Sequence, residues 1–228
     1  MKIVVLTGAG ISAESGIATF RGADGLWEGH RIEEVASPEG WYKNRELVLE
    51  FYNKRRRNVL ESSPNEAHNI LVELEDAHEV FIVTQNVDDL HERAGSSNIL
   101  HLHGEITKSR STANPKLVYD IEGSELDLGH NCELDSQLRP HIVWFGEAVP
   151  AIEEAVEIIQ EADILLIVGT SLQVYPAAGL VNYAPEKASI TVIDPNSPEV
   201  NLPNVTYLNC GASEGMQIFK KSLASYSS

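Results

Sequence analysis

Two histidines stand two positions apart at the end of a short apolar run. His101 and His103 flank Leu102, and Gly104 follows directly. Side chains two apart on a strand point to the same face, so the spacing predicts that both imidazoles face one side of a sheet. A lone histidine is more often structural than catalytic. An imidazole with an unperturbed pKa of about 6.5 nevertheless suits a general base, and the place of His103 at the strand end makes it the candidate.

A glycine-rich turn follows the first apolar run, Ile3–Leu6. Its sequence, Gly8-Ala9-Gly10-Ile11-Ser12-Ala13, fits the pattern G-x-G-x-x-A. Glycines at these places let a backbone approach a pyrophosphate, and the helix start that should follow favours negative charge. A hydride-transfer dehydrogenase would need a second strand ending in an acidic residue about 20 residues later, and none follows. Instead the glycine-rich segment Thr19–Trp27 is typical of a mobile loop.

Two amides and a carboxylate follow the second apolar run, Val80–Val83. Gln85, Asn86 and Asp88 carry groups that hydrogen-bond a ribose or a carboxamide. Asn86 or Asp88 would equally serve to cap the helix expected next. The two roles do not exclude each other, so the pattern leaves both open.

Five apolar runs predict buried parallel strands, and helical patterns lie between several of them. This alternation predicts an α/β fold with a doubly wound, Rossmann-like parallel sheet. Each run ends in a polar cluster, and the carboxyl ends of parallel strands meet at one edge, so one shared site is expected. The expected strands are Ile3–Leu6, Val80–Val83, Ile99–Leu102, Ile164–Val168 and Ile190–Ile193, and the expected helices are Ala67–Leu74, Asp88–Arg93 and Ile152–Glu161.

Two stretches interrupt this alternation. Residues from about 28 to 62 have a helical pattern, clearest over Glu46–Arg57, and residues from about 105 to 140 are polar and irregular, with breakers at Asn114-Pro115 and Gly129. We interpret both as one small helical and irregular module inserted into the sheet domain. The sheet domain is then expected over about 1–27, 63–104 and 141–228, and the small module over about 28–62 and 105–140.

Composition excludes several classes of protein. The formal net charge of −17 argues against binding nucleic acid through a broad basic surface, and it fits a soluble enzyme. No apolar run is long enough to span a bilayer, and the first residues lack the features of an export signal, so we expect no membrane and a cytoplasmic location. Cys132 and Cys210 are too few for a four-thiolate zinc site, and we expect no disulfide between them.

Taken in order, the motifs resemble the signature of the sirtuins, in particular the bacterial ones. The resemblance runs from the first strand to about Asn196 and is expected to extend to Ala212, and several of the motifs are specific to that family. The motifs that carry it are Gly8-Ala9-Gly10-Ile11-Ser12-Ala13-Glu14-Ser15-Gly16-Ile17, Thr19-Phe20-Arg21, Gln85-Asn86-Val87-Asp88, His101-Leu102-His103-Gly104-Glu105, Val143-Trp144-Phe145-Gly146-Glu147 and Gly169-Thr170-Ser171.

The resemblance implies an NAD-consuming protein-lysine deacylase. In this family the carbonyl oxygen of an acyl-lysine attacks the ribose carbon that bears nicotinamide, and nicotinamide leaves. The resemblance gives His103 the role of general base on a ribose hydroxyl, and Asn86 and Asp88 the role of holding the carboxamide. The products are free lysine, nicotinamide and O-acyl-ADP-ribose.

The resemblance also implies where NAD lies. Phe20 and Arg21 belong to a loop that closes over it, Ser171 contacts the adenosine side, and Asn196 the adenine ribose. Closure would exclude water, which otherwise intercepts an electrophilic sugar. The residues expected to hold NAD are Gly8, Ala9, Gly10, Ser12, Glu14, Phe20, Arg21, Gln85, Asn86, Val87, Asp88, Gly169, Thr170, Ser171, Asp194, Asn196 and Ala212.

The expected substrate is an acylated lysine of a protein, in an extended peptide added as a strand beside Val143, Phe145, Gly146 and Val174. Tyr52 and Arg55 are three apart on a helical segment, so they share a face where a guanidinium and a phenol can hold a carboxylate. The residues alone fit a solvated basic helix as well. Sirtuins that remove succinyl and malonyl groups carry a Tyr-x-x-Arg pair at this place, so the resemblance implies an acidic acyl group, with deacetylation retained.

The chain departs from the family in one respect. Most sirtuins bind a structural zinc through four cysteines, whereas the segment Thr107–Arg139 holds only Cys132. A mixed site with His130 and nearby aspartates is conceivable, but we predict no zinc. Something must then replace the contribution of the metal to folding. The expected replacement is an apolar cluster of Val118, Tyr119, Ile121, Leu126, Leu128 and Leu134.

Two other functions fit the same motifs. An ADP-ribosyltransferase would pass the ribose to a protein side chain, but the Tyr52 and Arg55 pair and the peptide strand favour deacylation. A non-enzymatic NAD sensor or scaffold would not need His103, Asn86 and Asp88. We therefore expect a deacylase that is a monomer or a weak oligomer.

Overall fold

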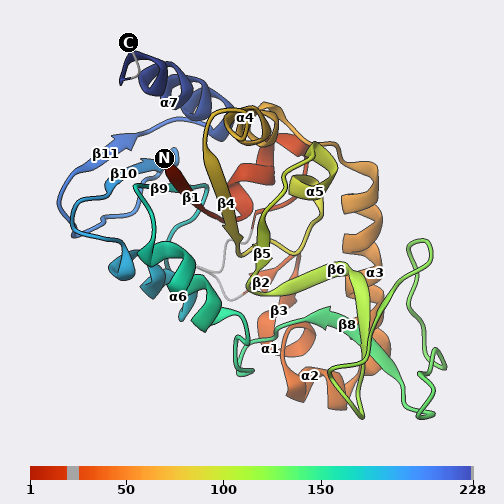
Figure 1. Cartoon of the computed structure of the whole chain (residues 1–228). Coiled ribbons are helices and arrows are strands. Elements are labelled where there is room, and N and C mark those ends of the chain that lie inside the picture. The colour runs from red at the N-terminus through yellow and green to blue at the C-terminus, as the bar shows by residue number, and fades with distance from the viewer. Residues whose placement is uncertain (20–25, 227–228) are drawn as a thin grey trace.

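A six-stranded sheet forms the centre of the computed structural model, which describes residues 1–19 and 26–226. Its order is β11-β10-β9-β1-β4-β5, and all pairs are parallel (Figure 1). Counted along the chain this is the 6-5-4-1-2-3 arrangement of a Rossmann sheet, in which the order reverses between β1 and β9. The strands are β1 Lys2–Thr7, β4 Glu79–Thr84, β5 Ile99–His101, β9 Ile164–Val168, β10 Ser189–Ile193 and β11 Val205–Leu208.

Helices cover both faces of this sheet, which confirms the doubly wound α/β prediction. On one face α4 (Glu66–Leu74) packs beside α7 (Ala212–Tyr226), and on the other α6 (Ile152–Gln160) packs beside the 3₁₀ helix η3 (Ala177–Tyr183) (Figure 1). Strand β9 is buried along its whole length, as expected for an apolar run covered on both sides. The five predicted strands and three predicted helices are all present. The helix predicted over Asp88–Arg93 is α5 (Leu90–Ala94).

The small module contains more strand than the sequence predicted. Three helices lead into it, α1 (Ile32–Val35), α2 (Pro38–Lys43) and the long α3 (Arg45–Glu61). The expectation that residues 105–140 are irregular is wrong where these residues form strands. The strands make an antiparallel sheet in the order β7-β6-β8. Its strands are β6 Gly104–Ser111, β7 Val118–Asp120 and β8 Leu138–Ile142, and a short hairpin of β2 Leu26–Trp27 and β3 His30–Arg31 precedes α1.

The predicted apolar cluster of this module does not form as expected. Leu126 is buried and Ile121 packs partly against the core, but Val118, Leu128 and Leu134 are 38, 49 and 55% exposed. Their side chains therefore contribute little burial of apolar surface.

A buried guanidinium joins the parts of the module instead. Arg56 of α3 is fully covered and donates to the carbonyl oxygens of Ile106 (2.6 Å) and Ser124 (2.8 Å) and to the side-chain oxygen of Asn53 (2.7 Å). That oxygen also accepts from the amide of Leu126 at 2.9 Å. Burial lowers the pKa of Arg56 to about 10, so it stays charged at neutral pH. One side chain thus links α3, β6 and the loop before residue 126.

The predicted division into two domains remains a prediction. The six-stranded sheet lies within the residues expected for the sheet domain, whereas the three-stranded sheet runs from Gly104 to Ile142, slightly beyond the range expected for the small module. In the described part of the chain no helix is both long and apolar enough to cross a membrane.

Candidate active site

A cavity of about 570 Å³ opens at the carboxyl ends of the central strands, where the strand order reverses. Its size suits a ligand of cofactor dimensions. Phe20 and Arg21 lie outside the described residues, and Ser12 lies behind the wall. Every other predicted site residue lines it: Gly8, Ala9, Gly10, Glu14, Tyr52, Arg55, Gln85, Asn86, Val87, Asp88, His103, Val143, Phe145, Gly146, Gly169, Thr170, Ser171, Val174, Asp194, Asn196 and Ala212.

The glycines of the first turn allow two loops to cross closely. A Cβ on Gly8 would lie 2.7 Å from the carbonyl oxygen of Gly169, and one on Gly10 only 2.5 Å from the Cα of Gly169. The amide of Gly10 donates to the Gly169 carbonyl at 2.8 Å. These glycines are therefore required by the contact between the β1 and β9 loops. The turn continues into the expected helix, which is the 3₁₀ helix η1 (Ala9–Ser15).

Ser12 organises the buried polar cluster at the end of β4. Its hydroxyl donates to Asp88 at 3.0 Å and accepts from the side-chain amide of Asn86 at 3.2 Å. Burial raises the pKa of Asp88, and the hydrogen bonds from Leu90 and Ser12 oppose that rise. Asp88 accepts from the amide of Leu90 at 3.2 Å at the start of α5. The carboxylate therefore binds the first amide of α5, from the position before its N-cap residue Asp89, while it also lines the cavity.

Gln85 and the acidic residues of the cavity are also held in place. The amide of Gln85 donates to the hydroxyl of Thr170 at 3.0 Å, which ties the end of β4 to the end of β9. Asp194 accepts from the amide of Asn196 at 2.7 Å, and Glu14 accepts from the amide of Ser213 at 3.0 Å. One bond between strand ends, one bond within a loop and one bond between η1 and α7 thus hold these polar side chains in place.

His103 has the geometry of a neutral base. Its Nδ1 lies 3.1 Å from the carbonyl oxygen of Gln85, so Nδ1 carries the proton and Nε2 keeps a free lone pair. Burial lowers the pKa of His103, which keeps the ring unprotonated at neutral pH. The carbonyl of His103 also accepts from the amide of Val143 at 2.9 Å. The candidate base is therefore joined to the segment expected to hold the peptide.

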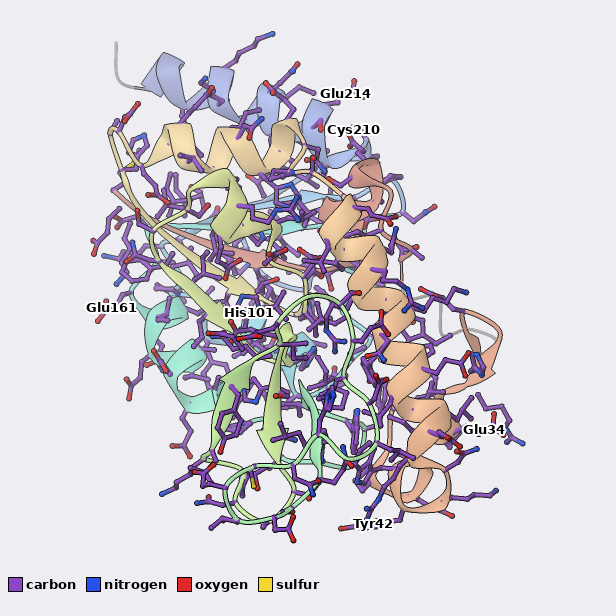
Figure 2. The ribbon with its side chains drawn as sticks, turned by 90° about the vertical axis from the view of Figure 1, so that its right-hand side faces the viewer. Glu34, Tyr42, His101, Glu161, Cys210 and Glu214 are labelled. Carbon is purple, nitrogen blue, oxygen red and sulfur yellow. The ribbon has the colours of Figure 1, made fainter. Side chains whose placement is uncertain are left out.

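His101 does not share this environment, which corrects the expectation of a common face. Strand β5 ends at His101, so the alternation does not extend to His103, and the cavity is lined by His103 alone of the two. His101, labelled in Figure 2, is partly buried, with Nδ1 3.0 Å from the Asn86 carbonyl and Nε2 2.7 Å from Glu92. Burial is the largest single influence and lowers its pKa, but the hydrogen bond to Glu92, the charge of Glu92 and the bond to Asn86 together raise the pKa above its ordinary value. Two histidines close in sequence thus have opposite shifts.

Tyr52 and Arg55 of α3 border the same cavity. The phenol oxygen accepts from Nε1 of Trp144 at 3.1 Å, and burial raises the pKa of Tyr52, so its proton remains available for donation. The guanidinium of Arg55 is 8% exposed and lies 4.3 Å over the ring of Trp27. Burial lowers the pKa of Arg55, and the carboxylate of Glu28 opposes that change. A cation and a hydroxyl donor therefore stand together at the cavity wall.

The Sir2 family profile matches residues 8–176 of the chain. This chain belongs to the Sir2 family, the sirtuins. The sirtuin is 58% identical over 217 residues to a Helicobacter pylori protein named NAD-dependent protein deacylase, covering 95% of this chain and 94% of the relative. It is 52% identical over 228 residues to a Bacteroides thetaiotaomicron protein of the same name, covering 97% of both.

Solved structures of the family agree with the fold. A Sir2 homologue in complex with NAD is 37% identical, with a TM-score of 0.89, and covers all of the sirtuin and 91% of the homologue. A Sir2 complex with a deacetylated p53 peptide and 3'-O-acetyl-ADP-ribose is 28% identical, with a TM-score of 0.80, and covers 96% of the sirtuin and 92% of that chain.

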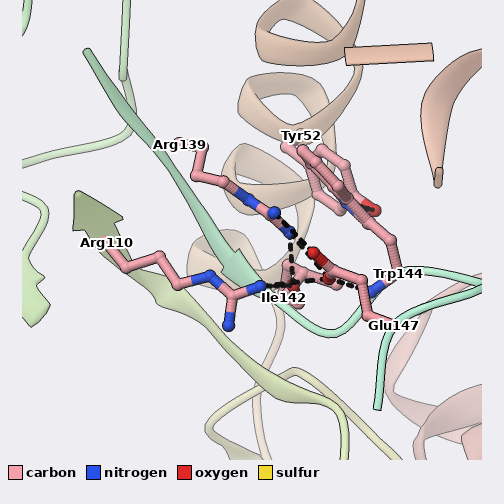
Figure 3. A network of polar contacts seen from close by, with 6 residues as sticks. All are labelled: Tyr52, Arg110, Arg139, Ile142, Trp144 and Glu147. Atoms are coloured by element: carbon pink, nitrogen blue, oxygen red, sulfur yellow. Dashed lines mark hydrogen bonds and ion pairs between the residues drawn. The ribbon is translucent and has the colours of Figure 1, made fainter. Parts of the chain in front are cut away.

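The segment of the sirtuin after β8 is held by one carboxylate (Figure 3). Glu147 accepts from Arg139 at 2.7 and 3.0 Å, from Arg110 at 3.0 Å and from the amide of Trp144 at 2.8 Å. Both arginines also donate to the carbonyl of Ile142. Burial tends to raise the pKa of Glu147, but its bonds to Arg139 and Trp144 lower it. The sequence placed Glu147 in a motif but gave no sign of this network, because Arg110 and Arg139 come from other strands.

The residues around Cys132 do not fit a zinc ion. The thiol of Cys132 donates to the hydroxyl of Ser111 at 3.2 Å, and Nδ1 of His130 accepts from the amide of Asp127 at 3.3 Å. Over residues 1–19 and 26–226 no three His, Cys, Asp or Glu side chains are placed to share a metal. The absence of zinc remains a prediction for measurement.

Three partners of site residues could not be found from the sequence. Ser12 was expected to contact NAD directly, whereas it orders Asn86 and Asp88 from behind the wall. Trp144 reaches Tyr52 across 92 positions of sequence, and Glu28 reaches Arg55 across 27. Only the fold brings such pairs together.

Proposed function

We propose that this sirtuin is an NAD-dependent lysine deacylase that removes succinyl and malonyl groups as well as acetyl. Deacylation is the activity named for relatives at 46 to 58% identity over most of their length. The acidic acyl preference rests on one observation, the buried cation of Arg55 beside the hydroxyl of Tyr52 in the cavity that also holds His103.

The residues of the cavity fit NAD as the co-substrate. Ala9 lines the cavity at the start of η1, and its amide donates to no backbone carbonyl among the described residues, which suits a phosphate oxygen. Gln85, Asn86 and Asp88 offer donors and acceptors for a ribose and a carboxamide. When bound, NAD supplies an activated ribose carbon and accepts the acyl group.

In this proposal His103 removes the proton of a ribose hydroxyl. Its Nε2 is the free ring nitrogen, since Nδ1 is engaged by Gln85, and its lowered pKa keeps it ready to accept a proton. Asn86 and Asp88 orient the carboxamide, and Ser12 holds both of them. The substrate lysine enters beside Val143–Gly146, where the bond from Val143 to His103 keeps base and peptide in register.

Arg55→Met tests the acyl preference. A carboxylate that loses a buried cation forfeits charge-assisted hydrogen bonds, so we expect kcat/KM for a succinyl-lysine peptide to fall by roughly 30- to 100-fold. The value for the matched acetyl-lysine peptide should change by less than about threefold, because an acetyl group needs no cation. Nicotinamide release and peptide mass are followed together.

Lys54→Met is the matched control, since it removes an exposed cation from the same helix. It should leave the ratio of the two activities unchanged. A parallel fall of both activities in Arg55→Met would reject the acyl assignment. A peptide or protein that gains the mass of ADP-ribose, in place of freed lysine, would indicate ADP-ribosyl transfer.

Several expectations stay with this proposal as predictions. They are a cytoplasmic location, acylated protein lysines as the partners, no binding of nucleic acid or membrane, and a monomer or weak oligomer.

A further inference from the structure

In this structure the guanidinium of Arg55, the cation proposed to bind the acyl group, already forms an ion pair with Glu28. An oxygen of Glu28 lies 2.5 Å from a terminal nitrogen of Arg55, and the two side chains are 23 and 8% exposed. Asp88 also acts electrostatically on Arg55, but it is bonded to Ser12 and Leu90. Glu28 is therefore the carboxylate paired with this guanidinium among the described residues.

The backbone conformation at position 28 disfavours a glutamate. Trp27 pairs with His30 in the β2–β3 hairpin, and Glu28 and Gly29 form its two-residue loop with φ angles of 48 and 83°. Such a loop favours Asn or Gly at both positions, and a glutamate with positive φ is strained. Strain of this kind persists where another contact maintains it, and the ion pair with Arg55 is that contact.

The donors around Arg55 are only partly used. Its Nε is buried without a hydrogen-bond partner in the described part of the chain. The hydroxyl of Tyr52 accepts from Trp144, and no acceptor for its own proton lies among the described residues. The side chain of Glu28 ends in the same group, a carboxylate on a flexible chain, as a succinyl or malonyl lysine. The site thus retains donors for a second carboxylate while Glu28 holds one arm of the fork.

We propose that Glu28 is a built-in competitor for the acidic acyl group, and that its pairing with Arg55 sets the affinity for succinyl- and malonyl-lysine. This inference rests on the proposed function of Arg55. Two carboxylates on one guanidinium repel each other, so Glu28 must leave or weaken its contact when the substrate binds. Trp27 holds the guanidinium independently through its ring, so Arg55 stays in place without Glu28.

The test measures peptide binding to the NAD-free protein, so that no catalytic step enters. Fluorescence anisotropy gives Kd for matched succinyl- and acetyl-lysine peptides. We expect Glu28→Gln to lower Kd for the succinyl peptide about three- to tenfold, as when a binding-competent state rises from a minor to a full population. The acetyl peptide should show no comparable gain. Glu28→Asn, which suits the left-handed turn, should act in the same direction.

Two controls separate the outcomes. Glu50→Gln removes an exposed carboxylate from α3 and should not shift the ratio of the two Kd values. In an Arg55→Met background, Glu28→Gln should lose its effect. If the wild type prefers the succinyl peptide but Glu28→Gln leaves that Kd unchanged or raises it, Glu28 is no competitor. If the wild type shows no preference at all, the proposed function of Arg55 fails first.

Discussion

The crevice and the small module hold their loops by different means. In the crevice, glycines let the β1 and β9 loops touch through their backbones, and the side chains of Ser12 and Gln85 link the strand ends. In the small module, the long side chain of Arg56 reaches carbonyls of two separate segments. The crevice keeps the motifs of the family, whereas the module lacks the four cysteines that most sirtuins use.

Without a zinc, as we predict, the module needs other links between its distant segments. A zinc ion joins distant chain segments through short bonds to side chains. Arg56 joins α3, β6 and the loop near Ser124 through its five-donor guanidinium. Gln137 adds bonds to the carbonyls of Asp127, His130 and Leu138. Chemistry in the crevice and stability of the module should therefore respond to separate substitutions.

The largest expected effect lies in the crevice. His103→Ala removes the free ring nitrogen that faces the cavity, and a general base contributes about 10²- to 10⁴-fold. We expect kcat for deacylation to fall by at least about 100-fold, with NAD affinity and thermal midpoint nearly unchanged. Nicotinamide release and NAD titration by calorimetry measure the two quantities.

His101 supplies the comparison for that result. It is bonded to Glu92 and faces away from the cavity, so His101→Gln should lower kcat much less than His103→Ala. An equal loss from both variants would mean that the ring of His103 acts through structure alone. Full activity of His103→Ala would remove it from the mechanism.

The next effect lies in the module. Arg56→Met removes the donor of the Ile106 and Ser124 carbonyls, and it leaves the oxygen of Asn53 with the amide of Leu126 as its donor. Each buried group that loses its partner is costly, and we expect the free energy of unfolding to fall by about 3 kcal/mol. Urea unfolding followed by circular dichroism measures the change.

Arg57→Met is the matched control for Arg56. Arg57 is the next residue of α3, its side chain is 46% exposed, and it pairs with Glu125 at the surface. Its loss should change the free energy of unfolding by no more than about 0.5 kcal/mol. Similar losses from both variants would show that the module does not depend on the buried guanidinium.

The contrast between the crevice and the small module also explains which features could be predicted from the sequence. The sheet and its site follow from apolar runs and from the polar clusters at their ends, which are local patterns. Strand β11 was missed, because Val205–Leu208 is short and only partly buried. Strands β6 and β7 were missed because polar and charged residues fill most of their positions, buried ones included, and because they pair only with each other and β8.

Side-chain partners were the least predictable part. Three residues of a type common in cores stay exposed, because no other described part of the chain covers them. They are Val118, Leu128 and Leu134. Arg56 is of a residue type usually found at the surface but is fully buried, because it meets two carbonyl acceptors from distant segments and a third acceptor, Asn53, from its own helix. Whether a charged side chain is buried therefore depends on the acceptors that the fold brings to it, and the residue type alone does not show these.

Acid should weaken the sheet domain through two buried histidines below the crevice. His68 of α4 and His91 of α5 are fully covered, and their rings lie 4.9 Å apart. Burial lowers the pKa of His68 to about 4 and also lowers that of His91. The unfolded chain therefore binds more protons between pH 6.5 and 4, and stability is lost as the pH falls through this range.

For His68 this loss amounts to about 2 kcal/mol at pH 5, relative to neutral pH. His68→Gln should reduce the acid loss by about that amount, since glutamine does not titrate. Glutamine also retains an acceptor for the amide of Asn65, which His68 holds at the start of α4. Urea unfolding at pH 7.5 and pH 5 compares the two proteins. An unchanged pH dependence would show that His68 is not a source of the acid loss.

The smallest expected effect is that of metal removal. A structural zinc contributes directly to folding, so a chelator would unfold a module that depended on one. The thiol of Cys132 is bonded to Ser111, and the imidazole of His130 to the amide of Asp127, so neither group is arranged for a metal. We expect less than about 0.1 zinc per purified chain by mass spectrometry, and a thermal midpoint shifted by less than about 1 °C in EDTA. One tightly held zinc per chain would mean that Arg56 supplements a metal and does not replace it.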